Sequence, residues 1–69
     1  MERTPVSSSN ILSIGYDPDS STLEIEFKGG SVYQYAGVPQ CEFDGLMSAS
    51  SQGIYFNANI KDRYSCVKL

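Results

Sequence analysis

The fold is decided by residues 22–35, which read TLEIEFKGGSVYQY. In the first half of this stretch Leu23, Ile25 and Phe27 alternate with polar side chains, and this period of two predicts a strand with one buried and one solvated face. Gly29-Gly30 then favours a hairpin, because glycine reaches the positive φ of tight turns. Residues 31–36 suit a second strand, so the stretch predicts a β-hairpin at the centre of the fold.

The length of the hairpin loop determines which face carries Tyr33 and Tyr35. A two-residue loop would place both rings on the solvated face. A three-residue loop over residues 28–30, with a glycine bulge, would pair Ile25 with Tyr33 and Leu23 with Tyr35, because a change of one residue in register reverses every side chain. We favour the bulged loop, since a thin core needs the area of two large rings. A place in the core, a place on a recognition surface, and a packed ring with an exposed hydroxyl all stay open for this pair.

A third strand is expected before the hairpin. Residues 10–16 alternate, with Leu12, Ile14 and Tyr16 on one face, which again predicts a strand. The following segment, residues 17–21, contains proline, aspartate and serine and predicts a turn. The three strands would form an antiparallel meander.

Two short helices are expected after the hairpin. Pro39 suits the first position of a helix. The apolar stripe of this helix is formed by Phe43, Leu46 and Met47. Ser51 is a candidate cap for a second helix that runs to about Lys61, and the ending, residues 64–69, is open between an edge strand and coil. We therefore predict an α+β fold over residues 1–69 as one domain, a three-stranded antiparallel meander with two short C-terminal helices packed on one face.

The composition excludes several classes of enzyme and metal site. The 69 residues include no histidine and only two cysteines, which excludes a histidine-based triad and zinc sites with histidine or four thiolate ligands. Hydrophobic residues make up 41%, more than a disordered chain carries. No apolar run approaches the roughly 18 residues of a membrane span, and the polar start lacks the pattern of a signal peptide. We expect a cytoplasmic protein that makes no membrane contact.

The carboxylates and thiols form no catalytic or metal-binding motif. Glu24 and Glu26 share a strand face at roughly 7 Å, an arrangement typical of a solvated surface. Residues 17–19 lack the further ligands of a calcium loop. Cys41 and Cys66 are expected to be half-buried thiols, because a reducing compartment opposes a disulfide. The protein is therefore not expected to be an enzyme or to hold a metal or cofactor.

Charge is distributed unevenly along the chain. Residues 1–60 carry two basic and seven acidic side chains, whereas residues 61–69 carry three basic and one acidic. An acidic body repels phosphate backbones, so any phosphate-binding surface must be small and close to the tail. Arg63 could join Tyr55 and Tyr64 in an aromatic–basic patch, because a guanidinium stacks on rings and bases alike.

An ordered set of landmarks spans most of the chain. They are Val6-x-Ser8-Ser9-x-Ile11, Ile14-Gly15-Tyr16-Asp17, Leu23-Glu24-Ile25-Glu26-Phe27, Gly30, Tyr33-x-Tyr35-x-x-Val38-Pro39, Ala49-Ser50-Ser51-x-Gly53-x-Tyr55-Phe56-Asn57 and Ile60-Lys61-x-x-Tyr64. This set resembles the KTSC domain family, a module of similar length that occurs alone in bacteria and at the C-terminus of some lysyl-tRNA synthetases. The resemblance implies an association with RNA and marks Tyr33 and Tyr35 as the central motif. The tail departs from the family, because Ser65-Cys66-Val67 stands where members are often more basic or aromatic.

We therefore predict a noncatalytic binding module, an accessory domain associated weakly with RNA or tRNA. The candidate binding residues are Tyr33, Tyr35, Lys61, Arg63 and Tyr64. The alternative is a protein–protein interaction module without nucleic-acid contact, which would bind a protein partner or a second copy through an open strand edge.

Overall fold

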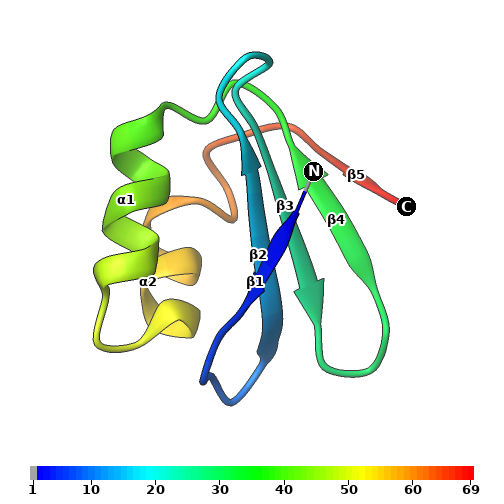
Figure 1. The fold of residues 1–69 in the computed structure, drawn as a ribbon, viewed down its shortest axis with the longest axis vertical. Coiled ribbons are helices and arrows are strands. Elements are labelled where there is room, and N and C mark those ends of the chain that lie inside the picture. Colours follow the sequence, from blue (N-terminus) through cyan, green and yellow to red (C-terminus); the bar gives the residue numbers. More distant parts are fainter. Residues whose placement is uncertain (1) are drawn as a thin grey trace.

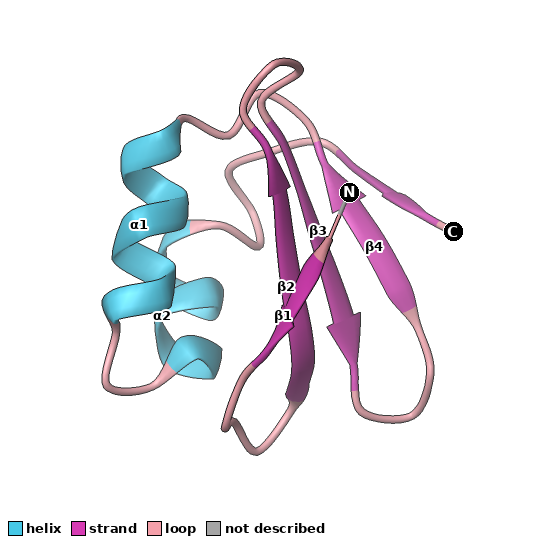
Figure 2. Cartoon of the chain, viewed as in Figure 1, coloured by secondary structure: helices cyan, strands magenta, loops and turns pink. Residues whose placement is uncertain are grey.

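A five-stranded antiparallel sheet and two helices form two layers in the computed structural model, which describes residues 2–69 (Figures 1 and 2). The strands are β1 (Arg3–Pro5), β2 (Ile11–Asp17), β3 (Thr22–Phe27), β4 (Val32–Tyr35) and β5 (Cys66–Lys68). They lie in the order β1-β2-β3-β4-β5, and both helices, α1 (Gln40–Ser48) and α2 (Gln52–Asn59), cover the same face. The predicted α+β class is confirmed, and β1 and β5 extend the predicted three-stranded meander at its two edges.

The hairpin between β3 and β4 has the predicted bulged register. Ile25 pairs with Tyr33 and Leu23 pairs with Tyr35. The Phe27 N–H donates to the Ser31 carbonyl at 2.8 Å, which closes a loop of three residues. Two of these three are Gly29 and Gly30, with φ of +109° and +98°, values that L side chains rarely adopt. Both tyrosines therefore lie on the helix side of the sheet.

Strand β2 contains a bulge that the alternating pattern does not reveal. The register shifts between Ile11 and Ser13, so Ile11 pairs with Phe27 while Ile14 pairs with Ile25. Ile11 and Ile14 are 0% and 1% exposed, whereas Leu12 is 45% exposed. The prediction that Leu12 faces the core was wrong, because the extra residue of the bulge gives its core position to Ile11.

The two edge strands are short, and all of their residues are exposed. β1 pairs with β2, and β5 pairs with β4, where Cys66 lies opposite Tyr35 and Lys68 opposite Tyr33. β5 resolves the open prediction for the chain's end in favour of a strand. β1 was not predicted, since Arg-Thr-Pro shows no alternation and Pro5 is tolerated only at an edge.

The helices begin at residues close to the predicted ones. Pro39 is the N-cap of α1, with extended backbone (ψ 155°), and not the first helical residue as predicted. In α2 the Ile54 N–H donates to Ser51 Oγ at 3.3 Å, so the predicted cap is confirmed. No helix within residues 2–69 is long and apolar enough to cross a membrane.

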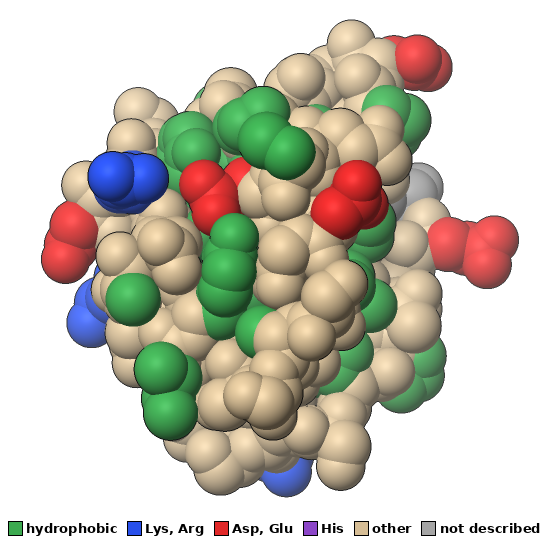
Figure 3. Space-filling model, turned by 90° about the vertical axis from the view of Figure 1, so that its left-hand side faces the viewer, with side chains coloured by type: hydrophobic (Ala, Val, Ile, Leu, Met, Phe, Trp, Pro, Cys, Tyr) green, Lys and Arg blue, Asp and Glu red, His purple; other side chains and the backbone are tan. Residues whose placement is uncertain are grey.

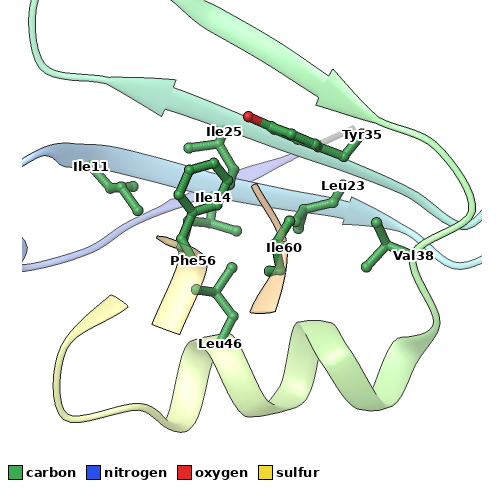
Figure 4. Packing of buried hydrophobic residues seen from close by; sticks show 9 residues of the cluster. All are labelled: Ile11, Ile14, Leu23, Ile25, Tyr35, Val38, Leu46, Phe56 and Ile60. Atoms are coloured by element: carbon green, nitrogen blue, oxygen red, sulfur yellow. The ribbon is translucent and has the colours of Figure 1, made fainter. Parts of the chain in front are cut away.

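The core lies between β2–β4 and the two helices (Figure 4). Its buried side chains are Ile11, Ile14, Leu23, Ile25, Tyr35, Val38, Leu46, Phe56 and Ile60. Phe43 and Met47 pack on its margin beside Leu46, which confirms the predicted stripe of α1. Cys41 and Cys66 are both free and exposed, not half-buried as predicted: Cys41 lies in the first turn of α1 and Cys66 on an edge strand.

Candidate binding groove

An open groove of about 590 Å³ lies on the helix side of the sheet, between β4 and the C-terminal end of α2. Five separate segments meet around it: the residue before β2, the β3–β4 hairpin, β4, the end of α2 with its following turn, and β5. The lining residues are Asn10, Phe27, Lys28, Ser31, Tyr33, Tyr35, Phe56, Asn57, Lys61, Asp62 and Cys66. The volume falls within the roughly 300–1,000 Å³ of typical small-molecule sites.

The floor of the groove is aromatic. Phe56 contacts the edges of Phe27 and Tyr35 at centroid distances of 5.5 and 5.4 Å, and Phe27 meets Tyr33 at 5.8 Å with an interplanar angle of 80°. Tyr35 and Phe56 are only 4% exposed, whereas Phe27 and Tyr33 are half-buried. The ring surface that a ligand can reach therefore belongs to Phe27 and Tyr33.

Tyr35 lies deeper than its neighbour in the motif. Its ring belongs to the core, and its hydroxyl points away from Val38 along the sheet (Figure 4). Burial, together with the nearby Cys66 and Tyr33, raises the pKa of Tyr35 to about 12. Tyr35 thus supports the floor as a neutral phenol and offers no free face for stacking.

The rim of the groove is polar and carries more positive than negative charge. Lys28 comes from the hairpin and Lys61 from the turn after α2, and Asp62 is the one carboxylate among the lining residues. Lys68 shares the face of β5 with Cys66 and lies opposite Tyr33, next to the groove. The amides of Asn10 and Asn57 add neutral donors and acceptors.

The acidic side chains of the central strands lie on the other face of the sheet. Glu24 accepts from Gln34 Nε2 at 2.9 Å and forms an ion pair with Arg3 at 3.2 Å. Glu26 accepts from Ser13 Oγ at 3.0 Å. Since neighbouring strand residues point to opposite faces, the sheet separates these carboxylates from the groove.

The outer surface of the helix layer is not basic. In this view carboxylates lie in the upper middle and at the margin, and basic side chains lie at the margin (Figure 3). Helix α1 contributes Glu42 and Asp44 and contains no lysine or arginine. The groove thus combines positively charged side chains with half-buried rings.

Three of the five predicted binding residues line the groove: Tyr33, Tyr35 and Lys61. Arg63 and Tyr64 do not line it; Arg63 is exposed and Tyr64 packs beside the core. A binding role for all five remains a prediction. Sequence reasoning missed Lys28 and Asn10, which strand pairing brings in from distant segments. Asn57 had a signal, since it is one of the landmark residues.

Tyr64 and Tyr55 meet at a carboxylate. The Tyr55 hydroxyl donates to Glu42 Oε1 at 2.6 Å and the Tyr64 hydroxyl to Glu42 Oε2 at 3.1 Å. The hydrogen bond to Glu42 raises the pKa of Tyr55, and partial burial, with the same carboxylate, raises that of Tyr64. The aromatic–basic patch predicted from Tyr55, Tyr64 and Arg63 thus contains a carboxylate at its centre.

Within residues 2–69 no three His, Cys, Asp or Glu side chains group as metal ligands would.

A sequence model of one family, the KTSC domain, matches residues 7–64. The chain belongs to the KTSC domain family. The resemblance carried by the ordered landmarks is confirmed, and the groove-lining Tyr33 and Tyr35 lie within the matched region.

Relatives of this KTSC domain occur alone and within larger proteins. An uncharacterized protein of Stutzerimonas stutzeri is 39% identical over 93% of this chain and 90% of its own length, and a protein of Tsukamurella paurometabola is 43% identical over 94% and 97%. A lysine–tRNA ligase of a Nostoc species is 39% identical over 78% of this chain, which corresponds to 10% of the ligase.

A KTSC domain of known crystal structure shares the fold described above. The KTSC domain protein from Yersinia pestis is 52% identical, with a TM-score of 0.94 over 99% of this chain and 96% of that one. The two-layer arrangement is thus that of a solved member of the family.

Proposed function

We propose that the chain is a noncatalytic module that binds RNA weakly through the groove on the helix side of the sheet. The observation that carries this proposal is the position of two half-buried rings, Phe27 and Tyr33, among lining residues that include Lys28 and Lys61. Unpaired bases stack on aromatic rings, and lysine amines neutralise phosphates. The amides of the rim suit the edges of a base.

The net charge of −3 would repel RNA if it were spread evenly over the surface. The fold separates much of the negative charge from the groove, so the repulsion there is weaker than the net charge suggests. Glu24 and Glu26 lie behind the sheet, so the groove region presents Lys28, Lys61 and the adjacent Lys68 against Asp62. The number of phosphates that such a small site can neutralise is two or three. Weak affinity with a shallow salt dependence is the expected signature.

The relatives also support a function in RNA binding. In the Nostoc protein the matched segment is a tenth of a lysine–tRNA ligase, an enzyme whose name includes tRNA as its substrate. We infer from this context that the module acts near tRNA. This support is an analogy between relatives and adds to the chemistry of the groove without replacing it.

The test is a titration with tRNA at several salt concentrations. We expect binding at about 50 mM salt with tens of micromolar protein, and a log–log slope of about −1.4 to −2.1 for two or three phosphates. Lys28→Ala and Lys61→Ala should each weaken binding, and the two together should remove most of the affinity. Arg63→Ala is the matched control, since it removes one positive charge outside the groove.

Two outcomes would overturn the proposal. Absence of binding at about 50 mM salt would exclude the RNA function. An equal loss of affinity from Arg63→Ala and from either lysine variant would show that RNA responds to overall charge and not to the groove.

The exposed edge of β5 favours a second candidate, a protein–protein interaction module. The Leu69 N–H donates to the Val32 carbonyl, and the Ala36 N–H donates to the Ser65 carbonyl. In an antiparallel pair every second residue turns its N–H and C=O groups away from the neighbouring strand, so those of Cys66 and Lys68 point outward. Val67 and Leu69 are 64% and 63% exposed beside this edge. A partner or second copy that adds a strand here would be recovered in a pull-down resistant to nuclease, or detected by sedimentation, without any binding of RNA.

A further inference from the structure

We infer that the groove holds a single nucleoside monophosphate unit, with its base stacked on Tyr33 and its phosphate held by Lys28 and Lys61. This inference rests on the proposed function and names the part of the RNA that the groove recognises. Its shared chemistry, a base joined to a phosphate, occurs both in an RNA strand and in a free nucleotide.

The geometry of the rings limits the groove to one base. Stacking needs an accessible ring face, and Tyr35 and Phe56 are 4% exposed. The two half-buried rings, Phe27 and Tyr33, stand at 80° to each other with centroids 5.8 Å apart. A base parallel to Tyr33 therefore meets Phe27 nearly at a right angle, so Phe27 serves as a wall and not as a second stacking platform.

Two kinds of polar side chain surround the Tyr33 ring: lysines that can hold a phosphate and amides that can bind the edge of a base. Lys28 and Ser31 come from the hairpin, and Lys61 comes from the turn after α2. Neither lysine takes part in the ion pair formed within residues 2–69, which joins Arg3 to Glu24 on the other face. Both amines are free to contact a phosphate. The amides of Asn10 and Asn57 provide donors and acceptors for a base edge.

The inference is tested by amide NMR titrations of the full chain with nucleoside 5′-monophosphates, ribose 5-phosphate and inorganic phosphate. We expect the monophosphates to shift the signals of groove residues such as Tyr33, Ser31 and Asn57. Ribose 5-phosphate should bind roughly 5- to 150-fold more weakly, the factor that one base–ring stack supplies. Tyr33→Leu should lower the affinity for monophosphates by a similar factor, while Tyr33→Phe, which keeps the ring, should retain it.

Titrations with nucleotides of increasing length, and with tRNA, separate this inference from the proposed function. Mono-, di- and trinucleotides should give similar shifts at Tyr33, with added affinity explained by added phosphates. A stacking-sized gain with each further base would overturn the single-base inference. Binding of tRNA without groove shifts from monophosphates would overturn it too while leaving RNA binding intact, whereas failure of every nucleotide and tRNA would remove both. Equal binding of inorganic phosphate and monophosphates would also contradict it.

Discussion

At Gly45 a missing side chain allows the two helices to approach. A Cβ at this position would overlap the Tyr55 hydroxyl of α2 and lie 2.9 Å from Tyr55 Cζ. Gly→Ala inside a helix normally stabilises by roughly 0.5–1 kcal/mol. Here we expect Gly45→Ala to lower the free energy of unfolding by about 1–3 kcal/mol, because overpacking displaces the Tyr55 ring.

The matched control is Gly53→Ala, measured in the same urea unfolding experiment. A Cβ at Gly53 would meet Ser8 Oγ at 3.7 Å, an ordinary contact, so this helical glycine should show the normal stabilisation. A Gly45→Ala variant as stable as Gly53→Ala would contradict the role given to Gly45.

Tyr35 makes stability depend on pH in the alkaline range. Its pKa is raised from 10.0 to about 12 in the folded chain, so the folded state holds the proton more tightly than the unfolded state. This contribution is complete below pH 10 and is lost as pH rises toward 12. Unfolding curves followed across this range, together with tyrosinate absorbance, should show a fall in stability that Tyr35→Phe reduces. The raised pKa values of Tyr55 and Tyr64 act in the same direction and account for part of the remaining fall.

At the scale of elements, Glu42 joins three segments. It lies in the first turn of α1 and accepts from Tyr55 of α2 and from Tyr64, in the segment that leads to β5. A hydrogen bond to a charged group contributes about 1.5–3 kcal/mol, and partial exposure here reduces that value. We expect Glu42→Gln to lower the free energy of unfolding by about 1 kcal/mol. We also expect it to speed amide hydrogen exchange in β5.

Double-mutant cycles of Glu42→Gln with Tyr55→Phe and with Tyr64→Phe measure the two bonds separately. The shorter bond, from Tyr55 at 2.6 Å, should show the larger coupling. Asp44→Asn, an exposed neighbour on the same helix, should leave both stability and exchange unchanged. Absence of coupling in both cycles would show that the contacts do not stabilise the fold.

The elements that sequence could predict are those whose signal is local. The β3–β4 register followed from the need to bury two rings beside Ile25 and Leu23, and the helices followed from a stripe and a cap. The bulge at Leu12 was hidden because Ile11 and Leu12 are both apolar and either could face the core. β1 and β5 are three residues long and exist only through pairing with β2 and β4.

The candidate site follows the same division. Tyr33, Tyr35 and Lys61 stood out through composition and the family motif. Lys28 lies in the hairpin loop and Asn10 just before β2, and the antiparallel pairing of β2 with β3 brings them together. The return of the chain after α2 then adds Lys61 to the same groove. Side-chain types suggest the chemistry of such a site, but long-range pairing decides its members.

For the whole molecule, the position of a charge matters more than the net charge. The chain extends 27 × 24 × 23 Å, whereas the Debye length is about 8 Å at 0.15 M salt. Asp62 lines the groove, while Asp19 lies outside the lining, in the turn at the far end of β3, about 20 Å along the strand from Lys28 of the hairpin. Asp62→Asn and Asp19→Asn change the net charge equally but should not change RNA affinity equally.

At low salt both variants should bind RNA more tightly than the parent chain, because unscreened repulsion acts across the molecule. At about 0.15 M salt the effect of Asp19→Asn should vanish, while Asp62→Asn keeps a gain of roughly twofold to fivefold from relief of one close repulsion. Fluorescence anisotropy with a labelled single-stranded RNA at both salt concentrations measures this difference. Equal gains from the two variants at the higher salt would mean that the bound RNA does not occupy the groove, since only a ligand beside Asp62 responds to that carboxylate through the screening salt.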